Sequence, residues 1–99
     1  MAWRLEYLQS ARKSVERLNP QIRQRIRMYL VDRVATLDDP RKIGKPLKGP
    51  MSAYWRFRVG DYRIICDIQD DRLVILVVTV GHRSNIYQSP ARAAGPQDG

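Results

Sequence analysis

The spacing of apolar residues divides the chain into a helical part between two stretches of strand-like sequence. Residues 3–8 alternate apolar and polar side chains, which is the pattern of a half-buried strand. Two amphipathic helices are predicted next. Ser10 is the expected N-cap of the first, and Asn19 is that of the second, which has Pro20 in its first turn and ends before Pro40. Their apolar residues recur at helical spacing and predict one buried face: Ala11, Val15, Leu18, Ile22, Ile26, Tyr29, Leu30, Val34 and Leu37.

The second half of the chain returns to a period of two after a linker at residues 41–51 that contains prolines and glycines. Gly60-Asp61 predicts a two-residue hairpin turn, and Asp70-Asp71 predicts the turn that follows. Three strands are expected, at residues 53–59, 62–68 and 72–80, and the last is apolar enough to be central. The predicted fold class is α+β, with an antiparallel sheet made of the N-terminal strand and a three-stranded C-terminal meander. Both helices are expected to pack on one face of that sheet.

Length and composition fit one small domain. We expect it to span residues 1–88, followed by a disordered tail at 89–99, where small and polar residues dominate. The single cysteine, Cys66, has no disulfide partner and no Cys/His set for zinc, and we expect it to be inert in the core. No apolar signal segment is visible, and the longest apolar run, residues 73–78, is too short to span a bilayer. The prediction is a cytoplasmic protein without a metal, a cofactor or a membrane contact.

Charge narrows the possible partners. The formal net charge is +8, and fourteen of the eighteen basic residues are arginine, whose planar guanidinium suits bidentate phosphate contacts. One stretch, from Arg41 to Gly60, has six cations and no acid: Arg41, Lys42, Lys45, Lys48, Arg56 and Arg58. A solvated basic surface is one interpretation. The aromatic residues interleaved with these cations favour the other interpretation, a nucleic-acid interface.

The predicted hairpin sorts these residues by face, because directly opposed residues share a side of the sheet. One face, expected beneath the helices, holds Trp55, Phe57, Val59, Tyr62, Ile64 and Cys66. The other holds Tyr54, Arg56, Arg58 and Arg63. Opposed like charges are unfavourable, so an anion is expected to join the arginines on an uncovered face. Pairing with Asp67, or spreading over Ile65, is the alternative. A turn centred on Asp70-Asp71 pairs Arg63 with Val78 and lets Arg83 and Tyr87 fold back towards Arg63.

The inventory of reactive groups excludes several classes of enzyme. The acids are scattered, there is no glycine-rich phosphate loop or dinucleotide fingerprint, and no Ser-His-Asp set is evident. A two-metal nuclease needs clustered carboxylates. Attack by the neighbouring 2′-hydroxyl of RNA is compatible with the chain, because the substrate supplies the nucleophile. The protein then has to orient it and to stabilise charge on the phosphate.

One set of motifs resembles a known family. Residues 47–49 (LKG), 54–65 (YWRFRVGDYRII) and 80–83 (VGHR), followed by Tyr87, are similar to the RelE/ParE superfamily of toxin–antitoxin toxins, closest to the RelE branch, over about residues 2–88. The resemblance implies the fold predicted above and a metal-independent endoribonuclease that cuts mRNA in the ribosomal A site. It also implies a cognate antitoxin protein as partner. Two alternatives remain: a ParE-like inhibitor of DNA gyrase, and a catalytically degenerate binding module.

The resemblance also implies roles for individual residues. Arg56 is expected near the scissile phosphate, Arg63 and Arg83 stabilise the transition state, and Tyr87 positions the substrate. His82 is either a proton-transfer group or a packing residue. The residues expected to bind nucleic acid are Lys45, Lys48, Tyr54 and Arg58. The chain departs from the pattern at Tyr54, where studied members carry lysine, and at Ser84-Asn85, where many carry charged residues.

Overall fold

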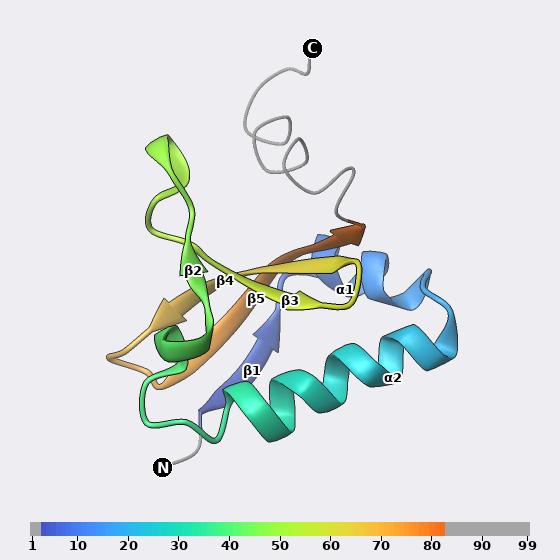
Figure 1. Cartoon of the computed structure of the whole chain (residues 1–99), viewed down its shortest axis with the longest axis horizontal. Coiled ribbons are helices and arrows are strands. Elements are labelled where there is room, and N and C mark those ends of the chain that lie inside the picture. The colour runs from blue at the N-terminus through green and yellow to red at the C-terminus, as the bar shows by residue number, and fades with distance from the viewer. Residues whose placement is uncertain (1–2, 83–99) are drawn as a thin grey trace.

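The centre of the computed structural model, which describes residues 3–82, is a five-stranded sheet in the order β1-β5-β4-β3-β2 (Figure 1). The strands are β1 (Arg4–Tyr7), β2 (Lys45–Pro46), β3 (Trp55–Val59), β4 (Tyr62–Gln69) and β5 (Val74–His82). The helices are α1 (Gln9–Glu16), α2 (Pro20–Met28) and its π-helical continuation η1 (Tyr29–Val34). Two 3₁₀ turns, η2 (Pro40–Ile43) and η3 (Gly49–Met51), follow. The predicted tail at 89–99 and the boundary before it lie outside the described residues.

The helices begin for different reasons. Asn19 caps α2 as predicted, because its Oδ1 accepts a hydrogen bond from the backbone N–H of Gln21 at 2.8 Å, with Pro20 in the first turn. The prediction for Ser10 is wrong. Helix α1 begins at Gln9, its N-cap is Leu8, and no side chain caps it. Leu8 is the single residue between the end of β1 and the start of α1, so this apolar residue occupies the cap position.

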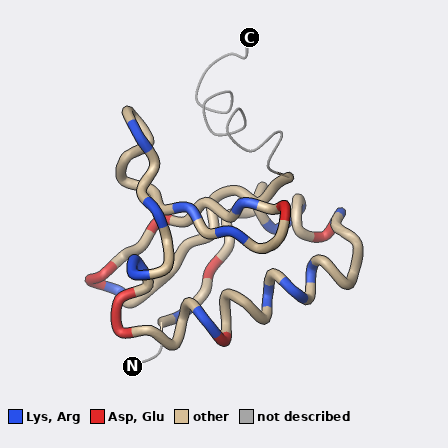
Figure 2. The backbone as a smooth tube through the Cα atoms, in the orientation of Figure 1, with Lys and Arg blue, Asp and Glu red and all other residues tan. Residues whose placement is uncertain are grey.

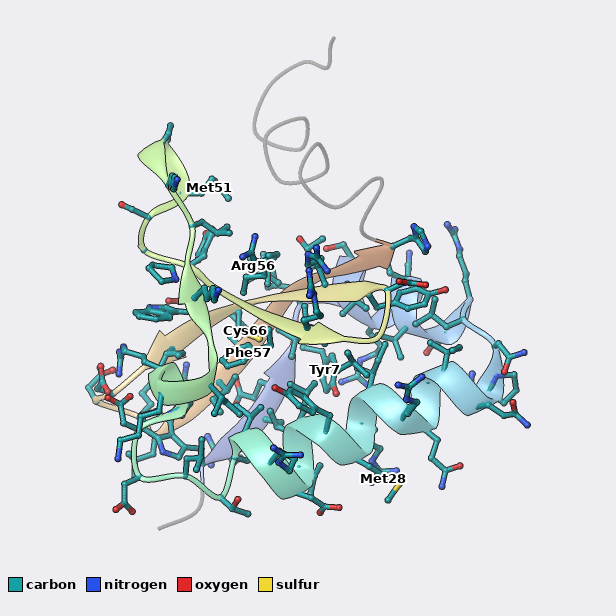
Figure 3. The ribbon with its side chains drawn as sticks, viewed as in Figure 1. Tyr7, Met28, Met51, Arg56, Phe57 and Cys66 are labelled. Atoms are coloured by element: carbon teal, nitrogen blue, oxygen red, sulfur yellow. The ribbon has the colours of Figure 1, made fainter. Side chains whose placement is uncertain are left out.

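The helical layer covers one face of the sheet, as predicted (Figure 1). Phe57, Ile64 and Cys66 from the sheet pack with Ile26 and Leu30 from the helices, and all five side chains are at most 1% exposed. Figure 3 shows Phe57 and Cys66 on the helix side of the sheet, with Arg56 on the opposite side. Directly opposed residues of β3 and β4 pair as predicted from the Gly60-Asp61 turn. The two faces of the hairpin are therefore those expected from its alternation.

The N-terminal strand differs from the expectation in its direction. β1 lies at one edge and pairs with β5 in parallel, from Arg4–Val74 to Tyr7–Val77, so the sheet is mostly and not wholly antiparallel. β5 lies between β1 and β4, which confirms that this apolar strand is central. Alternation along β1 shows which side chains face the core. It carries no information on strand direction, because both directions bury the same face.

The pairing of β4 with β5 also differs from the sequence-based register. The turn closes on the pair Gln69–Val74, with a four-residue loop in which Leu73 has a φ of 52°. A bulge between Ile65 and Cys66 shifts the register once more. Arg63 therefore faces Gly81 and not Val78. A leucine at positive φ is uncommon, and glycine is the residue that usually marks such a conformation. The sequence therefore contains no sign of the longer loop.

The predicted linker contains ordered structure. β2 pairs with β3 through Lys45–Arg56 and Pro46–Trp55, and the backbone N–H of Leu47 donates to the carbonyl of Tyr54 at 3.1 Å. We call residues 44–54 the basic arm; it projects from the edge of the sheet (Figure 1). At its base, a Cβ atom on Gly44 would lie 2.8 Å from Cε1 of Phe57. Among residues 3–82 no helix is long and apolar enough to cross a membrane.

Candidate nucleic-acid interface

The predicted cationic residues meet on the face of the sheet that the helices leave open. Lys45 lies opposite Arg56, and Arg58 lies opposite Arg63, so these four side chains share one side of three neighbouring strands. We call them the basic face. Figure 2 shows basic residues along β3 and the basic arm, with no acid among them. This arrangement concentrates positive potential where a polyanion could lie against the sheet.

Burial differs within the basic face. Lys45 and Arg58 are exposed, Arg56 is half-buried, and Arg63 is only 7% exposed. The expectation of an uncovered face is therefore wrong for Arg63. Ile65, two residues further along β4, is also buried, with 1% of its surface exposed. Arg63 has no side chain opposite it on β5, because Gly81 occupies that position. It forms the floor of the basic face, and Arg58 forms part of the rim.

One cation of the acid-free stretch, Arg41, is paired with two acids from outside the stretch. Nη1 and Nη2 of Arg41 donate to the two carboxylate oxygens of Asp70 at 3.1 and 2.6 Å, and Nη1 also reaches Asp39 at 3.2 Å. The hydrogen bond to Asp70 raises the pKa of Arg41, and the same bond lowers the pKa of Asp70. Both carboxylates lie outside the stretch in sequence. The charge of Arg41 is thus compensated within the fold, and the interpretation of the stretch as a nucleic-acid footprint stays a prediction.

The remaining predicted binding residues lie on the basic arm. Lys48 is exposed beyond the two residues that pair with β3, and Tyr54 is half-buried where the arm rejoins the sheet. Within residues 3–82, Lys45, Lys48 and Arg58 form no ion pair. Their charges are therefore available to a ligand. Whether they bind nucleic acid stays a prediction.

The end of β5 places the histidine on the face of the sheet that carries Tyr62, and not on the basic face. His82 is exposed, lies opposite Tyr62, and meets its ring edge-on with ring centroids 5.6 Å apart. The neighbouring pair in the ladder is Arg63–Gly81, so the chain leaves β5 beside Arg63. Arg83 and Tyr87 lie outside the described residues, and their predicted approach to Arg63 stays a prediction. Within the described residues, no group of three His, Cys, Asp or Glu side chains could hold a metal ion.

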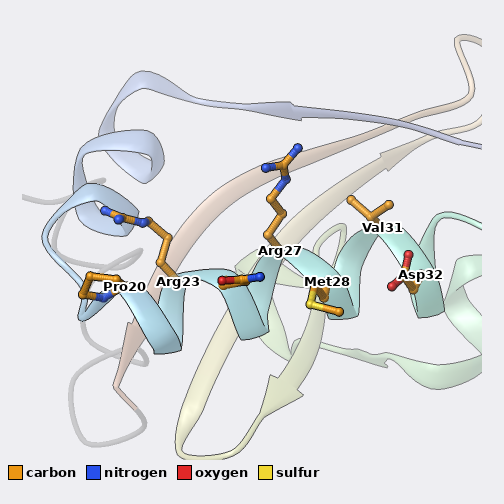
Figure 4. A pocket seen from close by; sticks show the side chains of 7 residues that line it. Pro20, Arg23, Arg27, Met28, Val31 and Asp32 are labelled. Carbon is orange, nitrogen blue, oxygen red and sulfur yellow. The ribbon is translucent and has the colours of Figure 1, made fainter.

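A groove that the sequence analysis missed runs between β1 and α2. It has a volume of about 360 Å³, and its apolar lining is contributed by Leu5, Tyr7, Val15 and Ile26. Arg23 and Arg27 line it and also a second hollow of about 510 Å³ along the outer side of α2 and η1 (Figure 4). Burial raises the pKa of Tyr7 in this groove. The only sequence signal was the i, i+4 spacing of Arg23 and Arg27, which charged helix faces commonly show.

The sequence places the chain in a class of small toxins. Residues 5–87 match the family described as "ParE toxin of type II toxin-antitoxin system, parDE", and the chain belongs to this family. Among curated proteins it lies close to RelE. It is 25% identical to Toxin RelG of Mycobacterium tuberculosis over 88 residues, which cover 89% of this chain and 99% of that protein. It is 27% identical to the mRNA interferase toxin RelE of Escherichia coli K12 over 95 residues, which cover 93% and 97%.

Solved structures agree on the fold. The toxin–antitoxin complex RelBE2 of Mycobacterium tuberculosis superposes with a TM-score of 0.76 at 23% identity, covering 85% of this chain and 94% of that one. The isolated Escherichia coli RelE toxin gives a TM-score of 0.66 at 22% identity, covering 94% and 99%. The predicted fold class and the resemblance to the RelE branch are confirmed.

Proposed function

We propose that this chain is the toxin of a toxin–antitoxin pair and an endoribonuclease that cleaves mRNA on the ribosome without a metal. The observation that carries the proposal is the basic face, where cations from β2, β3 and β4 meet on the open side of the sheet. The Escherichia coli relative named an mRNA interferase supports the same activity at 27% identity.

The proposed reaction is transfer of the phosphodiester to the neighbouring 2′-hydroxyl. The 2′-oxygen bonds to phosphorus, the bond to the 5′-oxygen breaks, and the products carry a 2′,3′-cyclic phosphate and a 5′-hydroxyl. The 2′-hydroxyl loses a proton and the leaving oxygen gains one. Arg56, Arg63 and Arg83 stabilise the negative charge that develops on the phosphate oxygens. Tyr87 is the proposed group for positioning the substrate and for proton transfer. The edge-on contact with Tyr62 favours the packing role for His82.

Arg63 is the residue that tests this mechanism. In the proposal Arg63→Ala lowers the cleavage rate by about 10²–10³, the usual effect of removing one preorganised donor. Arg63→Lys restores only part of it, because a point charge does not replace the planar fork. Arg4→Ala is the matched control. The Arg4 side chain is 68% exposed and lies on β1, at the edge of the sheet away from β2 and the basic arm. Cleavage by folded Arg63→Ala at the wild-type rate contradicts the assignment.

The end chemistry provides an independent test. Cleavage is expected to continue when free divalent ions are chelated, and to leave a cyclic phosphate or 3′-phosphate on the upstream fragment. Ribosomes need magnesium themselves, so the assay keeps them intact while free divalent ions are chelated, and the fragment ends are mapped in the same reactions. Upstream fragments with a 3′-hydroxyl rule out attack by the 2′-oxygen.

The proposed partner is an antitoxin with acidic and apolar residues. The open edge of β1 and the groove beside it offer strand pairing, an apolar floor and the charges of Arg23 and Arg27. Inhibition is expected by burial of the basic face, by displacement of residues 81–88, or by both, with affinity that falls at high salt. The partner is titrated against cleavage while hydrogen exchange is followed. Full inhibition with unchanged exchange in β1, the basic face and residues 81–88 contradicts this account.

A second candidate function is inhibition of DNA gyrase, because the matching family is named for ParE. The two functions separate when the protein is induced in cells and mRNA 5′ ends are mapped beside plasmid topology. Codon-phased mRNA cuts support the nuclease, and gyrase-dependent DNA breaks support the inhibitor. If neither appears, the chain is a binding module with a toxin fold.

A further inference from the structure

The basic arm is attached to the body of the protein by few direct contacts. Its strand, β2, consists of two residues, which pair with β3. Beyond this pairing, the backbone hydrogen bond from Leu47 to Tyr54 is the only one in the described residues that joins the two sides of the arm. Lys48 lies beyond the two residues that pair with β3, so it does not share the basic face with Arg63. The orientation of Lys48 therefore depends on how the base of the arm is held.

Arg41 holds that base from one side. It lies in η2, directly before the arm, and its guanidinium reaches the β4–β5 loop through the two bonds to Asp70. It also lies over the ring of Trp55 in β3, with Cζ 5.9 Å from the ring centroid. Asp39 accepts both from this guanidinium and from the backbone N–H of Arg41, at 3.2 and 3.1 Å. We call Arg41 with Asp39 and Asp70 the clasp.

The other side of the base is held by close packing. Gly44 follows η2, and the space that its Cβ would need is filled by the ring of Phe57, which is 1% exposed. Gly44 thus packs against the buried ring, and its backbone N–H donates to the carbonyl of Arg41 at 3.2 Å.

We propose that the basic arm is a docking element for RNA phosphates away from the scissile bond, and that the clasp positions it. The proposal rests on the proposed function for the nature of the partner. It extends the contact surface from Lys45 of the basic face along the arm to Lys48, and it adds a positioning residue. Lys45 and Lys48 supply the contacts, because lysine binds phosphates as a point charge on a flexible stem. Arg41 acts through the arm, since its own charge is compensated by two carboxylates.

The test measures binding of a single-stranded RNA oligonucleotide over a series of salt concentrations. All variants carry Arg63→Ala, so that the RNA is not cleaved. Replacing Lys45 and Lys48 by alanine removes two contacts, which should lower the slope of log K against log salt by about 1.4. Between 50 and 200 mM salt, this slope corresponds to a roughly sevenfold smaller loss of affinity than in the parent.

Asp70→Asn tests the clasp, because positioning of the arm and a pure effect of net charge predict opposite changes in RNA affinity. Removing an acid from a basic protein strengthens RNA binding if only net charge matters. The proposal predicts weaker binding and a smaller salt slope, because the arm loses its orientation. Asp71→Asn is the matched control, since this neighbouring exposed acid forms no ion pair among residues 3–82 and carries the same charge. It should bind as tightly as the parent or slightly more tightly.

A combined variant separates positioning from general damage. Asp70→Asn should cause no further loss once Lys45 and Lys48 are alanines, because the clasp acts through them. Thermal unfolding of every variant confirms that it is folded. Equal affinity of Asp70→Asn and Asp71→Asn overturns the clasp, and an unchanged slope without the two lysines overturns the arm. Cleavage of mRNA by the wild type is measured separately. If RNA binding depends on the arm but no cleavage occurs, only the proposed function is contradicted. If cleavage occurs but binding does not depend on the arm, only this inference is contradicted.

Discussion

Replacing Gly44 with alanine tests how closely the basic arm is packed against the sheet. The added Cβ would lie 2.8 Å from Cε1 and 3.0 Å from Cζ of Phe57, and 3.3 Å from the carbonyl oxygen of Arg56. The ring cannot retreat, because Phe57 is 1% exposed and fills the core beneath the sheet. The carbonyl belongs to β3 and is equally constrained. The strain must therefore move β2 away from β3.

The expected cost is that of overpacking, about 1–3 kcal/mol. For a domain of this size it lowers the melting temperature on the order of 10 °C. Gly49→Ala is the control, because nothing lies within 4 Å of its Cβ position and only its φ of +67° opposes alanine. That cost is about 1–2 kcal/mol and should be largely relieved by asparagine, which tolerates the left-handed region. Asparagine at Gly44 should bring no such relief.

Thermal unfolding followed by circular dichroism measures both glycine variants and a double mutant. Gly44→Ala should destabilise less in a Phe57→Leu background, because the shorter side chain vacates the contacted ring positions. The RNA affinity of Gly44→Ala should fall together with its stability, since the strain moves β2 and the basic arm away from β3. Wild-type melting of Gly44→Ala, or an equal loss of stability in both backgrounds, refutes the assignment of the strain to this contact.

Three further predictions concern single groups. Burial raises the pKa of the Cys66 thiol, so iodoacetamide at pH 8 should label it only after unfolding, and labelling of the native protein contradicts its placement. The bond from Arg41 lowers the pKa of Asp70; its stabilisation is therefore complete above the unfolded value of about 3.9 and lost as pH falls through the folded pKa. An NMR titration in which Arg41→Gln leaves that pKa unchanged contradicts the clasp. Asn19→Ala should cost about 1 kcal/mol of stability and Ser10→Ala much less, and equal losses contradict the cap assignment.

Much of the fold and part of the site could be predicted from local pattern. The Asn19-Pro20 pair marks a helix start because the cap satisfies backbone donors within the first turn. The Gly60-Asp61 turn and the alternation on both sides of it were sufficient for the β3–β4 register, and hence for which face carries Arg56 and Arg58. These features depend on interactions between residues close in sequence. The family motifs pointed to the same face.

Other features depend on residues far apart in sequence, and only the tertiary structure decided them. Asp39 and Asp70 lie on either side of the acid-free stretch, and their convergence on Arg41 compensates the charge of one of its cations. The four-residue loop and the bulge move Gly81 opposite Arg63, although the pattern of β5 is the same in either register. The burial of Arg63, the parallel direction of β1 and the groove beside α2 arise likewise when separate elements pack together. Periodicity reports which side of an element is apolar, whereas burial and ion pairing depend on which other element covers it.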